Sequence, residues 1–487
     1  MFDLTKEKKF LEDAYGFDQR NKASILSLNV EENEWKNQNS HNSELFDKQI
    51  PLKSAITRLS LKASQTTDSV QLQNINATIR DNEIELGKIQ DKINADPSLR
   101  TKQGTERVPP VKIVQKKLDK NSALLSYHLS ENRLLILVIT NREFNYHVTD
   151  IDKSFFLQID SFRSALYSPG QNKSNGSLSF SLYQKLIGEI GDRLTDITRL
   201  VIIPDDELHY LPFEALQYAD NTYLVQKFAI QYQYSTALFE QPGSHHGNKK
   251  TLAFAPFANK GFVDSAGNSL TKLPFSGEEV ASLEGKILID SSATKTQFLQ
   301  TADQFGIIHL ATHASVNNES PLRSFVSFFP ANQEEYGRLY AGEIYNLDLN
   351  STHLVILSAC ETGTGQLIKG EGLMSLSRAF AYAGCPNIIT SLWKAEDRTT
   401  AFISRKIHDY LQKGYTRDKA LQQAKLDLLN SHDIDPRFKS PNYWAHLVLI
   451  GQYEPGKTRK SSWWIVVLVI LLSAIAFQFT RRKLPRS

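Results

Sequence analysis

The chain has 487 residues, of which 41% are hydrophobic and 22% charged, and its 56 basic and 53 acidic residues give a formal charge of +3. This composition is typical of a folded protein of about two to four domains, and it excludes global disorder, a collagen-like chain and a polytopic membrane protein. The small basic excess argues against a nucleic-acid partner. The two cysteines, Cys360 and Cys385, are too few for a disulfide framework or a cysteine-rich zinc site.

Residues 1–105 are polar and rich in Asn, Gln, Lys and Glu, and we expect a helical N-terminal region, the remnant of a helical-repeat array. A heptad-like spacing of 3, 4, 7, 3 and 4 connects the apolar residues Leu72, Ile75, Ile79, Leu86, Ile89 and Ile93. Because the pattern lasts only about three heptads, it favours an amphipathic helix packed on a neighbouring helix. Self-association, or a partner helix bound through residues 70–94, is the alternative.

From residue 106 to residue 455 the chain alternates between short apolar runs and helical stretches. The apolar runs predict strands at residues 134–140, 144–148, 200–203, 251–255, 286–289, 307–311, 354–358, 387–390 and 446–450. The helical stretches between them cover residues 372–383, 399–413 and 416–429. Such alternation predicts an α/β fold with a mainly parallel sheet and helices on both faces. In such sheets functional residues collect at the carboxyl ends of the strands.

The C-terminal end carries residues 463–479, a run of apolar residues without a charge, with basic residues on both sides. This length is at the short end of what a membrane-spanning helix needs, and a helix satisfies its own backbone in lipid. We therefore expect one transmembrane helix at 463–480 followed by a basic tail at 481–487. A buried core helix is the alternative. Since the first residues show no secretory signal, we expect the large N-terminal body in the cytoplasm, tethered to the membrane by its C-terminus.

Two predicted strands are followed by residues that carry chemistry. His313 follows the strand at 307–311, and Cys360 follows the strand at 354–358. If these strands are neighbours, both side chains emerge at the same edge of the sheet. A nearby imidazole poises a thiol toward thiolate, so the pair would form a cysteine–histidine hydrolase site. Two unrelated residues, one packed and one hydrogen-bonded, are the alternative.

Other chemistries fit these segments less well. His309 and His313 have the spacing of a metalloprotease pair, but a leucine rather than a glutamate follows His309 and the local pattern is that of a strand. We expect His309 to pack beneath the strand end. Gly365 and Gly370 have the spacing of a phosphate-binding loop, but Glu371 stands where that loop requires lysine. The sequence therefore predicts neither a metal nor a cofactor.

The stretches IIHLATHA, LVILSACETGTG, KGEGLMSLSRAFAYAG and ITSLWKAED closely resemble the CHAT family, which belongs with caspases, separases and gingipains. The resemblance covers residues 110–455 in the family's order. It implies a caspase-like α/β sandwich and peptide-bond hydrolysis, with His313 as base and acid and Cys360 as nucleophile. Small residues around both positions let backbone amides approach an oxyanion, and we expect those of Ala314 and Gly363 to do so.

The segment WKAED, which ends at Asp397, follows another predicted strand. It is similar to the WDVTD stretch of separase, whose Asp receives a basic side chain, although Lys394 and Glu396 depart from that pattern. A buried acid there favours Arg or Lys before the cut, because the charge is otherwise unpaired. The alternative for Asp397 is a helix N-cap. Trp393 is expected to wall the pocket or the core, and Asp205 is a further substrate-binding candidate.

The sequence therefore predicts a membrane-tethered cysteine endopeptidase that uses a Cys–His dyad, with a protein or peptide as substrate. A second hypothesis is a catalytically latent or vestigial caspase-like scaffold for protein–protein signalling. A third is an acyl transferase that uses the same dyad on a substrate other than a peptide.

Overall fold

The structure is a computed structural model, in which Met1–Glu454 forms one compact unit and Pro455–Ser487 a second. It describes residues 7–23, 26–27, 43–63, 66, 68–95, 108–167, 175–239, 250–263, 269–331, 337–394 and 396–456. The predicted transmembrane helix at 463–480 and the basic tail at 481–487 lie outside these ranges. Within them, no helix combines the length and the apolar character that a membrane crossing requires.

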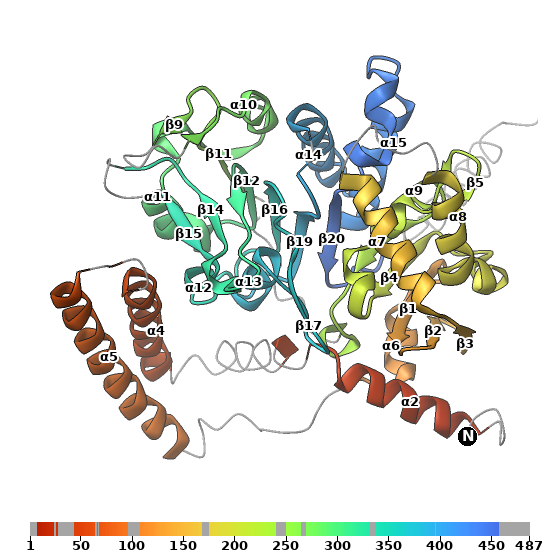
Figure 1. Ribbon diagram of the computed structural model, residues 1–487, viewed down its shortest axis with the longest axis horizontal. Helices are drawn as coiled ribbons and strands as arrows, with labels where there is room; N and C mark the ends of the chain where they lie inside the picture. Colours follow the sequence, from red (N-terminus) through yellow and green to blue (C-terminus); the bar gives the residue numbers. More distant parts are fainter. Residues whose placement is uncertain are drawn as a thin grey trace, which may run out of the picture. The chain divides into compact units, whose positions relative to one another are not determined.

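An eleven-stranded sheet forms the centre of the first unit (Figure 1), in the order β11-β8-β12-β16-β19-β20-β7-β4-β1-β2-β3. These strands are β1 (Ser122–Leu129), β2 (Arg133–Thr140), β3 (Phe144–Asp150), β4 (Arg199–Ile203), β7 (Ala229–Tyr232), β8 (Thr251–Ala255), β11 (Gly285–Ile289), β12 (Ile307–Ala311), β16 (Leu354–Ser358), β19 (Asn387–Ser391) and β20 (Leu447–Gly451). From β11 to β19 every pair is parallel, as are β1 with β4 and β4 with β7. Antiparallel pairs join β19 to β20, β1 to β2 and β2 to β3. The expected mainly parallel α/β sheet is therefore confirmed.

Helices cover both faces of this sheet, as the continuous apolar runs of its strands require. One face packs against α7 (Lys153–Tyr167), α8 (Asn175–Leu186), α9 (Leu224–Lys227), α10 (Pro274–Ala281), α14 (Asp397–Gln412) and α15 (Arg417–Asn430). The other packs against α2 (Lys8–Arg20), α6 (Val111–Lys117), α11 (Lys295–Thr301), α12 (Ala341–Ile344) and α13 (Leu376–Tyr382). In β12 the side chains alternate between the faces: Ile308 and Leu310 pack with Phe298 of α11, while Ile307 packs in the cluster that contains Ile403 of α14.

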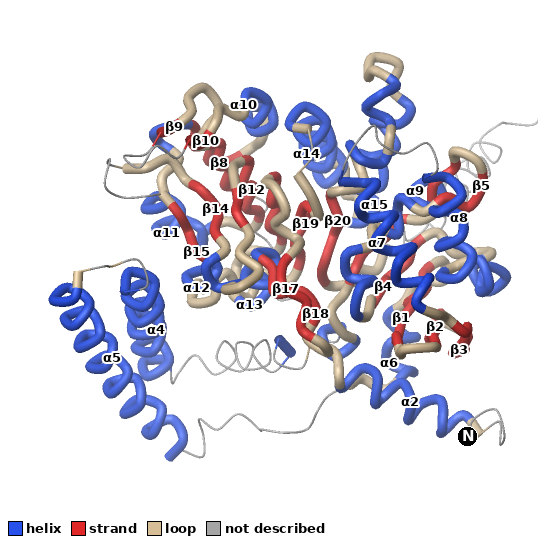
Figure 2. The backbone as a smooth tube through the Cα atoms, in the orientation of Figure 1, coloured by secondary structure: helices blue, strands red, loops and turns tan. Residues whose placement is uncertain are grey.

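Shorter strands lie outside the large sheet and are drawn in red in Figure 2. They are β5 (Gln217–Ala219), β6 (Thr222–Tyr223), β9 (Phe262–Val263), β10 (Ser269–Leu270), β13 (Ala314–Ser315), β14 (Phe325–Ser327), β15 (Arg338–Tyr340), β17 (Gly365–Ile368) and β18 (Gly372–Ser375). The strands β17 and β18 form an antiparallel hairpin in which Gly365 pairs with Ser375. The predicted helix at 372–383 is therefore wrong over its first four residues. The helix α13 begins only after Ser375, whose hydroxyl accepts a hydrogen bond from the Arg378 backbone amide.

The N-terminal residues contribute helices of two kinds. Helices α4 (Ser43–Ala63) and α5 (Ser69–Ala95) pack against each other, and Ile89 and Ile93 of the heptad pattern are buried beside Leu45 and Leu52. The helix packed on a neighbour is thus confirmed, and self-association through residues 70–94 stays a prediction. Helix α2 instead packs its apolar residues into the core beneath β1, β2 and β4. Helix α2 therefore shares a core with strands that follow residue 105, and the domain boundary expected at that residue stays a prediction.

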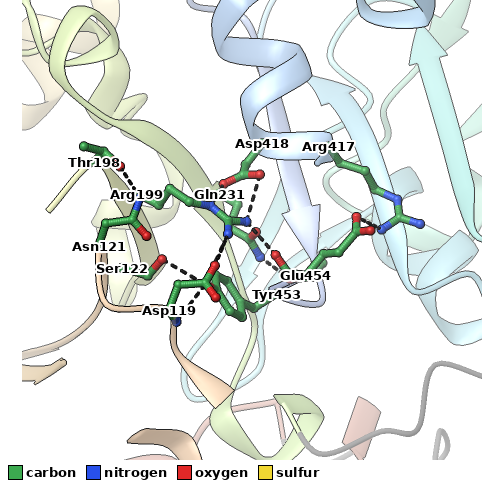
Figure 3. Close-up of polar contacts among 11 residues, drawn as sticks. Asp119, Asn121, Ser122, Thr198, Arg199, Gln231, Arg417, Asp418, Tyr453 and Glu454 are labelled. Carbon is green, nitrogen blue, oxygen red and sulfur yellow. Dashed lines mark hydrogen bonds and ion pairs between the residues drawn. The ribbon is translucent and has the colours of Figure 1, made fainter. Parts of the chain in front are cut away.

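A buried arginine ties the second half of the sheet to the segment after β20 (Figure 3). Arg199 in β4 is 2% exposed, and its Nε and Nη2 donate to the two carboxylate oxygens of Asp418 at 2.6 and 3.0 Å. Its Nη1 donates to Asp119 at 2.8 Å, and its Nη2 also donates to the Glu454 carbonyl at 2.6 Å. The guanidinium lies over the ring of Tyr453, 4.7 Å from the ring centroid. Such a fully bonded bidentate pair fixes geometry as well as charge.

Candidate active site

The strands β12 and β16 are parallel neighbours, and their register places the two sequence-predicted residues together. Ala311 pairs with Ser358, and the backbone amide of Thr312 donates to the Ser358 carbonyl at 3.2 Å. His313 and Cys360 each follow two residues after this last pair. Since neighbouring strands lie about 4.8 Å apart, both residues leave the sheet side by side at one edge.

The imidazole of His313 is oriented by a backbone carbonyl. Its Nε2 lies 2.7 Å from the Thr271 carbonyl oxygen, and its ring packs on Phe257 with 5.2 Å between centroids. Because a carbonyl only accepts, Nε2 carries the proton, and Nδ1 of the neutral ring keeps a lone pair. Burial lowers the pKa of His313, the Thr271 bond raises it, and the charge of Lys394 lowers it further. The ring is therefore neutral at pH 7 and has the tautomer of a general base at Nδ1.

The thiol of Cys360 is half-buried and free. Burial raises the pKa of this thiol, the charge of Lys394 lowers it, and the charges of Glu361 and Asp397 raise it. At pH 7 the Cys360 thiol is therefore protonated and the His313 imidazole is neutral. This differs from the expected thiolate, because burial disfavours the charged form of both groups.

We expect the alkylation of Cys360 by iodoacetamide to reveal this resting state. The thiolate fraction rises about tenfold per pH unit below the thiol pKa, so the alkylation rate should rise about tenfold per unit between pH 6 and pH 8. Mass spectrometry of the labelled peptide measures the rate, with Cys360→Ser as control. Cys385 is fully buried, and burial raises the pKa of its thiol to about 12, so it should stay unlabelled in the folded protein. A rate that is constant between pH 5 and pH 8 would contradict the neutral dyad, since a thiolate–imidazolium pair gives such a plateau.

The loop that follows Cys360 is strained and bonded to the next strand. Glu361 has φ of 58°, a left-handed conformation that is costly for a residue with a Cβ. The hydroxyl of Thr362 accepts hydrogen bonds from the Thr390 hydroxyl at 2.9 Å and from the Ser391 amide at 3.2 Å. These two features hold the loop that carries Cys360. Neither was predicted from the sequence, because neither Glu nor Thr is typical of such positions.

The two backbone amides expected at the oxyanion differ in their bonding. The Gly363 amide donates to the Ser391 carbonyl at 2.8 Å, so it is already engaged and holds the loop against β19. A Cβ at Gly363 would lie 2.8 Å from Cγ2 of Thr390, which explains why glycine is needed there. Ala314 forms a non-hydrogen-bonded pair with Val326 of β14, because the flanking bond runs from the Ser327 amide to the His313 carbonyl. The Ala314 amide therefore points away from β14.

The carboxylate of Asp397 lies at the start of α14, where it bridges to α10. Its Oδ2 accepts a hydrogen bond from the Phe275 backbone amide at 3.0 Å. The N-cap of α14 is Glu396, whose carboxylate accepts from the Thr399 amide at 2.9 Å, so the N-cap interpretation of Asp397 is wrong. Burial raises the pKa of Asp397 to about 6, against the lowering effect of the Phe275 bond. The charge of Asp397 contributes to the raised pKa of Cys360.

Two further sequence-predicted residues lie outside this site. Trp393 is 2% exposed, its Nε1 donates to the Asn442 carbonyl at 2.9 Å and its ring packs on Tyr167, so it belongs to the core. Asp205 accepts a hydrogen bond from the Leu129 amide at 2.8 Å. It follows β4, which is four strand positions from β16, or about 19 Å at the usual strand spacing of about 4.8 Å. The core position of Trp393 is one of the two that the sequence predicted, and the substrate-binding roles of Trp393 and Asp205 stay predictions.

A buried network that the sequence did not predict connects β12 to the two helices beside the site. His309 is fully buried, as expected, with Nε2 2.8 Å from Oε1 of Glu279 in α10 and Nδ1 2.8 Å from Nε2 of His408 in α14. The residues are far apart in sequence, which is why no local pattern indicated them. Among the described residues, no group of three or more His, Cys, Asp or Glu is arranged to hold a metal ion.

A profile of the CHAT domain matches residues 178–452, more than half of the chain. The chain belongs to the CHAT domain family. Its curated relatives include tetratricopeptide repeat protein 28 of Mus musculus, 26% identical over 306 residues, and of Homo sapiens, 24% identical over 305 residues. Each match covers 52% of this chain and 12% of the relative, so the CHAT chain spans about an eighth of the length of these proteins.

Two solved structures are similar to parts of this chain at low sequence identity. The Arg-specific cysteine proteinase gingipain R has a TM-score of 0.38 and 10% identity, with 61% of this chain and 75% of that chain covered. A separase–securin complex of Saccharomyces cerevisiae has a TM-score of 0.43 and 10% identity, with 82% of this chain and 36% of that chain covered.

Proposed function

We propose that this CHAT protein is a cysteine endopeptidase in which Cys360 is the nucleophile and His313 the general base and acid. The observation that carries the proposal is the placement of both residues after paired parallel strands, with Nε2 of His313 held by the Thr271 carbonyl. That bond leaves Nδ1 to accept the thiol proton. Membership in the CHAT family supports the same assignment.

The reaction starts from the neutral dyad. As Sγ of Cys360 attacks the substrate carbonyl carbon, its proton moves to Nδ1 of His313 and the carbonyl oxygen becomes an oxyanion. The backbone amide of Ala314 is the donor for that oxyanion. His313 then protonates the leaving amine, and the acyl group stays on Cys360. Water, deprotonated by His313, hydrolyses this thioester and restores the thiol.

Hydrolysis of short fluorogenic peptides tests the proposal. Peptides that end in Arg, Lys, Asp or Leu before the fluorophore are compared, each with and without iodoacetamide. We expect turnover of the Arg and Lys peptides that iodoacetamide abolishes. Turnover that survives complete alkylation of Cys360 would contradict a cysteine mechanism.

The half-buried carboxylate of Asp397 supports selection of a basic residue before the cut, because its charge lies at the same edge as Cys360. Its pKa of about 6 makes this selection depend on pH, since the protonated acid below pH 6 does not pair with a cation. We expect the ratio of kcat/KM for Arg to kcat/KM for Leu peptides to rise from pH 5 to pH 7. The titration of Cys360 and His313 affects both peptides equally, so it cancels in this ratio. In Asp397→Asn the ratio should fall by about tenfold or more at pH 7 and become independent of pH. A ratio that keeps its pH dependence in Asp397→Asn would assign the selectivity to another group.

A latent scaffold for protein–protein signalling is the second candidate function. The resting state favours it, because burial raises the pKa of the Cys360 thiol and no thiolate is prepared for attack. The two candidates predict different results. If the protein is a scaffold, Cys360→Ala should bind the partner as well as the wild type does, and neither form should cut a peptide.

We also propose that the uncharged run at 463–479 anchors the protein to a membrane, with the catalytic body on the cytoplasmic side. Deletion of residues 461–487 should move the protein from the membrane pellet to the supernatant after fractionation, because about 20 apolar residues supply the insertion energy. Deletion of 481–487 alone is the matched control, which keeps the apolar run and should stay in the pellet. Wild-type protein in the supernatant, or the longer deletion in the pellet, would contradict the anchor.

A further inference from the structure

The segment that follows β19 brings a lysine to the edge of the sheet where Cys360 lies. Strand β19 is the parallel neighbour of β16 (Figure 1), with Ile356 opposite Ile389. Cys360 comes four residues after the first member of this pair, and Lys394 comes five residues after the second. Because the two strands run in the same direction, Cys360 and Lys394 leave the sheet at the same edge.

Hydrogen bonds through one serine hold the segment of Lys394 against the loop of Cys360. The Ser391 carbonyl accepts a hydrogen bond from the Gly363 amide at 2.8 Å. The Ser391 hydroxyl donates to the Trp393 carbonyl at 2.6 Å. The peptide group directly before Lys394 and the loop after Cys360 are therefore bonded to the same residue, which keeps the two segments together.

The ammonium group of Lys394 is free to bind a ligand. The side chain is exposed, and no carboxylate of a described residue forms an ion pair with it. The acids that follow it in the chain, Glu396 and Asp397, each accept a hydrogen bond from a backbone amide instead. An unpaired lysine on a protein surface is ordinary, but this one stands beside a candidate nucleophile.

The charge of Lys394 affects both residues of the dyad. Burial raises the pKa of the Cys360 thiol and lowers the pKa of His313, and the Lys394 charge lowers the pKa of each group. This is the effect that a nearby cation has on a thiol and on an imidazole. A cation that favours a thiolate at this position also attracts the carboxylate of a molecule that approaches Cys360.

We infer that Lys394 is a specificity-determining residue that binds a carboxylate of the substrate beside the scissile bond. The preferred peptide then carries Asp or Glu next to the basic residue at the cut, so that its two opposite charges pair with Lys394 and Asp397. The choice of peptide rests on the proposed function, whereas the attraction of a carboxylate to Cys360 does not.

Two alkylating agents test the attraction without any catalysis. Iodoacetate and iodoacetamide are similar in size and react with the same thiolate, but only iodoacetate carries a negative charge. Their rates at Cys360 are measured on the full-length protein at pH 7 by mass spectrometry of the labelled peptide. The thiolate fraction affects both rates equally, so it cancels in the ratio of the iodoacetate rate to the iodoacetamide rate.

We expect Lys394→Gln to lower this ratio by about threefold or more, because the attraction of one unit charge is lost. Lys394→Arg keeps the charge and should keep the ratio close to the wild-type value. An ionic strength of about 1 M should lower the wild-type ratio, since it screens charges over about 3 Å. Because Lys394 is exposed, all variants should melt at the wild-type temperature.

The matched control is Lys413→Gln, which removes the same charge from the exposed residue after the last turn of α14. The 16 residues of α14 span about 24 Å at about 1.5 Å per residue. At an ionic strength of about 0.1 M charges are screened over about 10 Å, so this variant should keep the wild-type ratio. An unchanged ratio in Lys394→Gln, or an equal fall in Lys413→Gln, would overturn the inference.

Internally quenched peptides test the choice of substrate. Glu or Gln is placed directly before or directly after the Arg residue. We expect kcat/KM to be about threefold higher or more for Glu in one of the two positions, and this preference should disappear in Lys394→Gln. Cleavage without a preference for Glu would overturn the substrate assignment. If no peptide is cut while the reagent ratio still falls in Lys394→Gln, the peptidase proposal fails and the carboxylate site at Lys394 stands.

Discussion

Replacement of Cys360 by alanine is expected to lower kcat/KM for an Arg-ending peptide by about 10⁴-fold or more, because no other group at this edge forms the acyl-enzyme. His313→Ala should lower it by about 10³-fold, since the thiol then keeps its proton at pH 7. Steady-state fluorescence with purified variants measures both. The double variant should be no worse than Cys360→Ala alone, because the two residues act as one unit.

Cys385→Ala is the matched control for this prediction. Cys385 is also a free cysteine, it is fully buried, and its Sγ lies 3.3 Å from the Asn387 carbonyl. Its removal should leave kcat/KM within about twofold of the wild type, since burial raises the pKa of this thiol to about 12 and keeps it from solvent. Equal activity of Cys360→Ala and the wild type would contradict the nucleophile assignment.

The second large effect concerns stability and the Arg199 network. Arg199→Met should lower the free energy of unfolding by about 3–5 kcal/mol, because it leaves the 2% exposed carboxylate of Asp418 buried without its partner. Urea unfolding followed by circular dichroism measures the change. The double variant Arg199→Met/Asp418→Leu should recover most of the loss, since an apolar pair replaces a buried ion pair at little cost.

The control for this prediction is Arg437→Met. Arg437 pairs with Asp435 at 2.7 Å, but its side chain is 83% exposed, so its loss should leave the unfolding midpoint unchanged. If Arg199→Met lowers the free energy of unfolding by no more than Arg437→Met does, the buried network does not stabilise the fold.

Local patterns in the sequence were sufficient for the parallel strands β4, β8, β11, β12, β16 and β19 and for the strand-end positions of His313 and Cys360. They missed β1 and β7, which also form parallel pairs. The runs at 307–311 and 354–358 are short, apolar and β-branched, and they coincide with β12 and β16. The hairpin β17–β18 was not predicted, because residues 372–375 precede a true helix and share its apolar spacing. These residues form a strand because their backbone pairs with a neighbouring strand. The spacing of apolar residues along the chain does not reveal such pairing.

The remaining differences have the same origin. The hydroxyl of Tyr15 in α2 donates to the Pro109 carbonyl and accepts from the Thr236 hydroxyl, so its place in the core depends on residues 94 and 221 positions away. Trp393 is in the core because Asn442 and Tyr167 reach it from other segments. Glu396 rather than Asp397 is the N-cap of α14, because the Asp397 carboxylate is hydrogen-bonded to α10 instead. Each of these contacts is non-local, whereas sequence patterns describe neighbours along the chain.

The central claim is that Cys360 attacks the peptide carbonyl with His313 beside it, and a covalent probe tests it most directly. The wild-type protein is treated with a peptidyl acyloxymethyl ketone that ends in arginine, and the labelled residue is identified by peptide mapping with mass spectrometry. We predict one adduct per chain, on Sγ of Cys360, formed at least about ten times more slowly in His313→Ala. Labelling of Cys385 instead, or an equal rate in His313→Ala, would contradict the account.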